Sequence, residues 1–123
     1  MIIAKNSDVF NSNYDFTDSI IIDISWDSNL LDLLIKVDYY WNTDLGSNEL
    51  TIRFKSCRQM SFNMPNAYAD ISYEEKSTYI HSWYTITDCN IKSENGLLEI
   101  SIKTVDENPK WLNVVCDEVY LEL

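Results

Sequence analysis

The stretch TDCNIKSENGLLEISIKTV, residues 87–105, has the pattern of a complete β-hairpin. At its centre stands Asn95-Gly96, a pair favoured in two-residue type I′ turns because both positions take positive φ. Folding the chain there gives five cross-strand pairs: Glu94–Leu97, Ile91–Ile100, Cys89–Ile102, Lys92–Glu99 and Asp88–Lys103. Two of these pairs are apolar and two join opposite charges, which indicates an antiparallel ladder in a well-specified register.

A second alternating segment, residues 20–40, predicts another hairpin. With Ser28-Asn29 as a two-residue loop, four apolar pairs face the core: Trp26–Leu31, Ile24–Leu33, Ile22–Ile35 and Ile20–Val37. Four carboxylates then lie on the solvent side: Asp23, Asp27, Asp32 and Asp38. In this register a one-residue slip would bury aspartates.

Two further segments alternate. Leu50, Ile52 and Phe54 share one face, and residues 58–62 predict either a short strand or a bulged continuation. The final segment, residues 111–123, changes parity midway, which predicts a bulge near Asp117-Glu118. Between residues 63 and 78 the period is lost, and we expect a long connection containing one helical turn.

A chain of 123 residues suits one domain, residues 1–123. The segments predict an all-β fold: an antiparallel, hairpin-linked sandwich or flattened barrel of six to seven strands. A β-rich α+β fold, with a helix near residues 66–78 or at the N-terminus, is the second interpretation.

The net charge is −11, from 20 acidic and 9 basic residues. This balance argues against nucleic acid and anionic membranes as partners, since both are bound through basic side chains. It favours a basic protein partner, although acidity also keeps a protein soluble. No signal peptide or membrane-spanning run is apparent, and three widely spaced cysteines suit reduced thiols in a cytoplasmic protein.

Signatures of catalysis or of cofactor binding are missing from the sequence. The single histidine, His81, has no predicted nucleophile beside it, and two glycines cannot build a phosphate loop. We therefore expect no catalytic residue, no cofactor and no metal site. Scattered acids that could bind calcium weakly do not form a recognised loop: Asp15, Asp18, Asp27, Asp44 and Asp106.

Acids and tyrosines gather in the long connection, a combination that can anchor a basic partner. The predicted partner-binding residues are Tyr68, Asp70, Tyr73, Glu74 and Glu75, with Tyr40 and Asp44. The alternative is a solvated loop whose tyrosines pack on the sheet.

Three segments carry a family resemblance: YDFTDSIIIDISWD at residues 14–27, DYYW at 38–41 and LTIRFKSC at 50–57. Together, over residues 14–62, they resemble small acidic bacterial immunity proteins of polymorphic toxin systems. Several such families begin with an aromatic-x-Asp-Ser/Ala element, and Thr17 stands where some carry histidine. The resemblance implies a non-catalytic cytoplasmic protein that binds and blocks a toxin domain. It assigns no individual site residue.

Two other hypotheses remain open. A small-ligand-binding or enzymatic β-barrel domain would have a pocket lined by aromatics such as Trp83 and Tyr40. A structural module would form a homo-oligomer through an exposed strand.

Overall fold

The computed structural model describes residues 1–10, 14–40, 48–63, 72, 74–75, 83–104 and 110–123. In this part of the chain the named elements are seven strands and one short 3-10 helix, η1. Their bounds are β1 Ile2–Lys5, η1 Asn6–Val9, β2 Ile20–Trp26, β3 Leu33–Asp38, β4 Glu49–Phe62, β5 Ile86–Glu94, β6 Leu97–Thr104 and β7 Leu112–Glu122.

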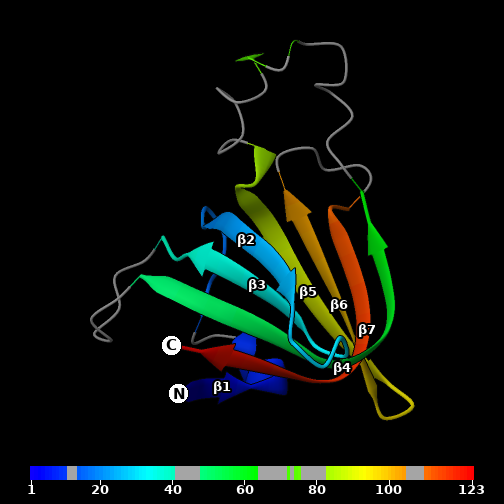
Figure 1. The fold of residues 1–123 in the computed structure, drawn as a ribbon. Coiled ribbons are helices and arrows are strands. Elements are labelled where there is room, and N and C mark those ends of the chain that lie inside the picture. Colours follow the sequence, from blue (N-terminus) through cyan, green and yellow to red (C-terminus); the bar gives the residue numbers. More distant parts are fainter. Residues whose placement is uncertain (11–13, 41–47, 64–71, 73, 76–82, 105–109) are drawn as a thin grey trace.

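All seven strands belong to one antiparallel sheet with the order β2-β3-β4-β7-β6-β5, and β1 pairs with β7 (Figure 1). β4 and β7 are long and run together through both halves of the sheet. On its other side β7 pairs with β6 through its first half and with β1 near its end. The predicted all-β antiparallel fold of six to seven strands is confirmed.

The sheet curls because β4 bends near its middle (Figure 1). The register with β7 shifts between Cys57 and Gln59, and Ser56 just before has a positive φ of 54°. The two outer strands therefore approach at one end, where Ile20 bridges Thr85. The sheet is thus strongly curved, but β2 and β5 do not pair as strands, so it is not closed into a barrel.

The core fills the inside of this curve. The faces predicted for residues 50–54 and for the last strand are confirmed, because each predicted apolar position there except Leu123 is fully buried. Residues 58–62 continue β4 past the register shift, so the second predicted alternative, a bulged continuation, is the one observed. The bulge expected at Asp117-Glu118 lies instead in the partner strand, between Cys57 and Gln59. The central buried side chains are Leu33, Ile35, Val37, Leu50, Ile52, Phe54, Ile100, Ile102, Leu112, Val114, Cys116, Val119 and Leu121.

The hairpin β5–β6 has the predicted register from Asp88 to Lys103, and a bulge shifts it only at Ile86. Its turn residues Asn95 and Gly96 have φ values of 53° and 78°, as the type I′ turn requires. All five predicted cross-strand pairs, from Glu94–Leu97 to Asp88–Lys103, are present.

The register predicted for residues 20–40 is wrong. Trp26 pairs with Leu33 and Ile24 with Ile35, so each β3 partner lies two residues beyond the predicted one. The connection is longer than two residues, and a bulge between Ile21 and Asp23 shifts the remaining pairs. Consequently Ile21 is buried, whereas Ile22 is 47% exposed.

The predicted solvent side of this hairpin also needs correction. Asp23 and Asp38 are exposed as expected, and Asp27 is partly covered. Asp32, however, is buried, with only 4% of its surface exposed. A buried carboxylate needs partners, and Asp32 finds them on β4.

The two chain ends lie side by side (Figure 1). β1 pairs with the end of β7, and the Leu123 N–H donates a hydrogen bond of 2.9 Å to the Met1 carbonyl. The described residues contain no helix long and apolar enough to cross a membrane.

Candidate functional site

A cleft of about 370 Å³ lies between the edge of β2 and aromatic residues near the ends of β4, β5 and β7. Both walls are mostly apolar, with one carboxylate among them. The lining residues are Ile21, Ile22, Asp23, Ile24, Phe62, Tyr84 and Trp111. A volume of this size is within the range of ligand-binding pockets, roughly 300–1,000 Å³.

The aromatic wall is organised around Trp111, which is buried just ahead of β7. The rings of Phe62 and Tyr84 meet its indole edge to face, at 67° and 87°, with centroids 5.1 Å and 5.8 Å away. Such edge-to-face pairs contribute about 0.5–1.5 kcal/mol each beyond buried area. The wall is therefore a rigid surface against which an apolar group can pack.

Two polar groups belong to this wall. The buried Trp111 indole N–H has no hydrogen-bond partner among the described residues. Burial raises the pKa of the Tyr84 hydroxyl. Tyr84 therefore remains protonated at neutral pH.

The opposite wall is the edge strand β2. After the bulge at Ile21–Asp23, the side chains of Ile22 and Ile24 border the cleft, and Ile24 is 39% exposed. Trp26 follows on the same strand and is 44% exposed. Exposed branched and aromatic side chains in a row on an edge strand form an apolar surface that a partner can cover.

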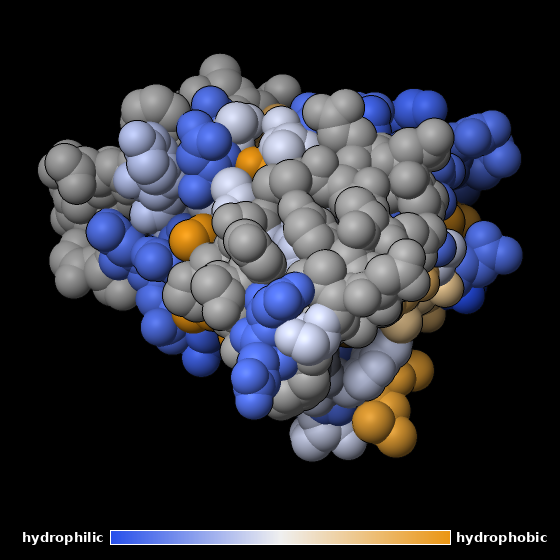
Figure 2. Space-filling model, turned by 90° about the horizontal axis from the view of Figure 1, so that it is seen from above, coloured by the Kyte–Doolittle hydropathy of each residue, from blue (hydrophilic) through white to orange (hydrophobic). Residues whose placement is uncertain are grey.

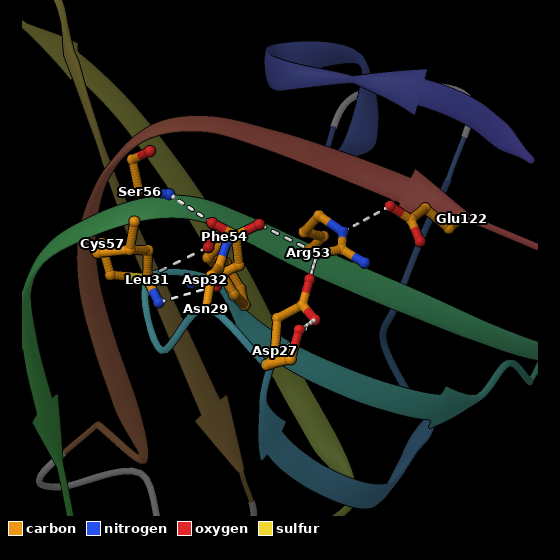
Figure 3. A network of polar contacts seen from close by, with 10 residues as sticks. Asp27, Asn29, Leu31, Asp32, Arg53, Phe54, Ser56, Cys57 and Glu122 are labelled. Carbon is orange, nitrogen blue, oxygen red and sulfur yellow. Dashed lines mark hydrogen bonds and ion pairs between the residues drawn. The ribbon is translucent and has the colours of Figure 1, made fainter.

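A second cluster, centred on Arg53, ties the β2–β3 connection to the sheet (Figure 3). The guanidinium group donates to Asp27 at 2.5 Å, to Asp32 at 3.0 Å and to Glu122 at 2.7 Å. The second Asp32 oxygen accepts from the Ser56 N–H at 3.0 Å. The β2–β3 connection, β4 and β7 are joined through one cation, so we interpret this cluster as structural.

The pKa values in the cluster agree with that interpretation. The Arg53 hydrogen bond and the Ser28 N–H hold the pKa of Asp27 below its usual value. Hydrogen bonds from Arg53 to Asp27 and Glu122 raise the pKa of the guanidinium further above its already high value. Neither shift moves a proton-exchanging group toward neutral pH, where acid–base catalysis would need it.

Most of the partner-binding residues predicted from sequence lie outside the described residues: Tyr68, Asp70, Tyr73 and Asp44. Of the remainder, Glu74 and Glu75 are exposed, and Tyr40 is 60% exposed. The Tyr40 N–H donates to the Ser19 hydroxyl at 3.0 Å. His81 also lies outside the described residues.

The pocket-lining aromatics expected for a ligand-binding domain are different from those observed. Trp83 is buried and Tyr40 is exposed, but neither lines the cleft. Sequence analysis missed the actual set because Ile22, Phe62 and Trp111 are far apart in the chain. The sequence did contain one signal, the apolar side chains that alternate along residues 20–26. We interpreted them as facing the core, whereas two of them border the cleft on an edge strand.

The cysteines are free thiols in the structure. Burial raises the pKa of Cys116 to about 12, and that of Cys89 still higher. Such thiols are poorly nucleophilic at neutral pH. Among the described residues no group of three or more His, Cys, Asp or Glu side chains is arranged to hold a metal ion.

No protein-family model matches the chain, and no curated protein matches it. Its fold is similar to that of a solved structure described as an uncharacterized protein from Neisseria gonorrhoeae, with a TM-score of 0.60 and 14% sequence identity. The alignment covers 89% of this chain and 94% of that one. This likeness concerns the fold alone.

Proposed function

We propose that this chain is a non-catalytic binding protein that engages a basic protein partner, and that the partner is a toxin domain which it neutralises. The observation behind this proposal is how the basic side chains are used. Arg53 is held by three carboxylates, Arg58 pairs with Asp117 at 3.0 Å, and Lys36 pairs with Glu49 at 3.2 Å.

Other basic residues also lie against the protein. Lys5 and Lys55 are positioned over the Tyr120 ring, 5.5 Å and 5.4 Å from its centroid, and Lys110 contacts the Ser101 hydroxyl at 3.3 Å. Among the described residues the exposed acids are Asp8, Asp15, Asp18, Asp23, Asp38, Glu49, Glu74, Glu75, Asp88 and Glu94. The outward field is therefore negative.

Such a field favours a basic partner. Complementary charge speeds encounter and discourages wrong partners. On the face seen in Figure 2, hydrophilic residues occupy much of the periphery and hydrophobic ones form separate patches. The resemblance to immunity proteins supports a toxin domain as the partner and the cytoplasm as the location.

The proposal is tested by affinity capture from the source cell's lysate at low and high salt. Each protein that is captured is then purified, and the rate at which it associates with this chain is measured at both salt concentrations. We expect one basic protein whose association slows steeply with salt. Replacing Glu74 and Glu75 together by Ser should weaken binding and leave thermal stability unchanged. Glu94→Ser, in the distant β5–β6 hairpin, is the matched control. A retained partner that is acidic, or whose association is insensitive to salt, would overturn the proposal.

The cleft supports one alternative, a domain that binds a small apolar ligand. Its volume and aromatic wall suit such a ligand. The two functions differ in salt dependence: apolar binding in the cleft should vary little with salt, whereas binding of a basic protein should weaken. A ligand screen followed by titration at two salt concentrations separates them.

A further inference from the structure

We propose that the partner supplies an extended segment that adds to the open edge of β2, with an apolar side chain in the cleft and a Lys or Arg facing Asp23. This inference rests on the proposed function, because it specifies where and how a basic protein is held. It adds one specific docking site to the acidic surface.

The first step concerns the backbone of β2. Among the described residues, β2 pairs with β3 on one side, and on the other only its start is bonded. There Ile20 bridges Thr85, and the Ile21 N–H donates to the Tyr84 carbonyl at 2.9 Å. From Ile22 to Trp26 this side of the strand remains open within the described structure.

The direction of the backbone groups can be derived from one hydrogen bond. The Asp27 N–H donates to the Asp32 carbonyl at 2.9 Å, so it points toward β3. Because the backbone N–H groups of an antiparallel strand point alternately to its two sides, the N–H groups of Ile24 and Trp26 point away from β3. They are positioned to bond with an added strand.

The second step concerns the side chains. Ile22 and Ile24 form one wall of the cleft, and Phe62 and Trp111 belong to the other. A strand laid beside β2 would place an apolar side chain between these walls. Strand addition gives affinity through the backbone, and such a pocket gives specificity.

The strand at the opposite end of the sheet order, β5, does not offer this combination. On β5 the side chains of Asp88, Asn90, Lys92 and Glu94 are all exposed. Charged side chains on an edge strand discourage pairing with another chain. The open edge of β2 therefore fits an apolar segment better.

The third step concerns charge, which selects a basic segment over a second copy of this chain. Asp23 lies within the open part of β2, residues 22–26, and lines the cleft. Two copies of this chain, each with a net charge of −11, would bring like charge together if they paired there, which disfavours their association. A Lys or Arg of a partner facing Asp23 would instead be favoured.

The test uses a capped peptide of alternating valine and lysine, about seven residues long to match β2. A matched peptide carries glutamate in place of lysine. Each is titrated into the full chain at low salt, with amide and indole shifts followed by NMR. We expect the lysine peptide to shift signals from Ile22 to Trp26 and the Trp111 indole, and the glutamate peptide to bind about tenfold more weakly or not at all.

Two variants locate the site. Trp26→Pro removes an N–H that points away from β3, so the sheet should persist while peptide binding is lost. Asp23→Lys should weaken binding of the lysine peptide about tenfold, and Asp38→Lys, on the same hairpin, should have a much smaller effect. Thermal unfolding of each variant checks that the fold remains.

Several outcomes would overturn this inference. These are shifts confined to Glu74 and Glu75, equal losses for Asp23→Lys and Asp38→Lys, no binding of the lysine peptide, or self-association of the chain that Trp26→Pro abolishes. The first outcome would still agree with the proposed function, because a basic segment would be bound elsewhere. Equal binding of both peptides would instead support the apolar-ligand alternative.

Discussion

The hairpins β5–β6 and β2–β3 hold their registers by different means. In β5–β6 the turn itself is sufficient, because Asn95 and Gly96 both take positive φ and connect the strands directly. In β2–β3 the connection is longer and is bonded to β4. The Leu31 carbonyl accepts from the Cys57 N–H at 2.9 Å, and Asp32 accepts from Ser56.

The register of a hairpin can therefore be set by its own turn or by tertiary contacts to other strands. The β5–β6 turn specifies its ladder without reference to the remaining sheet. The β2–β3 connection depends on β4, at the place where that strand bends. The second hairpin should therefore respond to changes in distant residues, and the first mainly to changes in its turn.

The largest effect is expected for Asp32→Ala. This substitution removes an anion from Arg53 and leaves the Ser56 N–H without its acceptor. We expect the free energy of unfolding to fall by about 3 kcal/mol, since a buried charged network loses one partner. Urea unfolding of the purified chain measures this change.

The matched control is Asp117→Ala, which breaks the exposed pair with Arg58. Exposed ion pairs contribute about 0–1 kcal/mol, so this variant should unfold close to the wild-type midpoint. Equal losses for the two variants would show that Arg53 is not a special link between the connection and β4.

Gly96→Ala tests the local means of setting register. The glycine has a φ of 78°, and an added Cβ would meet no atom within 4 Å, so the cost comes from the backbone. We expect a loss of about 1 kcal/mol in unfolding free energy, measured in urea. An unchanged midpoint would mean that the ladder, instead of the turn, maintains this hairpin.

Leu30→Gly is the reverse change in the other hairpin. Leu30 has a φ of 60° and is 73% exposed, so it combines backbone strain with little buried area. Relief of about 1–2 kcal/mol should exceed the entropy cost of glycine, giving a net stabilisation of about 0.5 kcal/mol. A lower thermal midpoint would show instead that the exposed leucine makes stabilising contacts.

These differences explain what the sequence could predict. The turn at Asn95-Gly96 and the alternation of Leu50, Ile52 and Phe54 are local signals, and they were sufficient for those strands. The alternation of residues 20–26 was ambiguous, because apolar side chains on an edge strand have the same period as buried ones. A two-residue loop at Ser28-Asn29 then gave the wrong register.

The candidate site was harder to predict for a related reason. Exposure of Glu74 and Glu75 follows from their charge. The cleft, by contrast, exists only because the bend in β4 brings Phe62 and Trp111 opposite Ile22. No short sequence pattern encodes a juxtaposition of three residues so far apart.

The smallest effect concerns acid stability through Asp27, at the start of the β2–β3 connection. Arg53 and the Ser28 N–H lower the pKa of this carboxyl from its usual 3.8 in the folded chain. A depressed pKa contributes stability above its unfolded value, and that contribution is lost as pH falls toward the folded value. Asp27→Asn should therefore be less stable than wild type near neutral pH, and the difference should narrow in acid. Because the side chain is one third exposed, the effect should be modest.

Urea midpoints of both proteins from about pH 7 to about pH 2 measure the effect. Elevated salt should reduce the difference near neutral pH, because an exposed pair is screened. A difference that remained constant across the pH range would assign Asp27 a geometric role, in which its carbonyl and side chain shape the connection. The register of β2–β3 would then depend on Asp32 and its bonds to β4, and its contrast with the locally determined β5–β6 hairpin would be sharper.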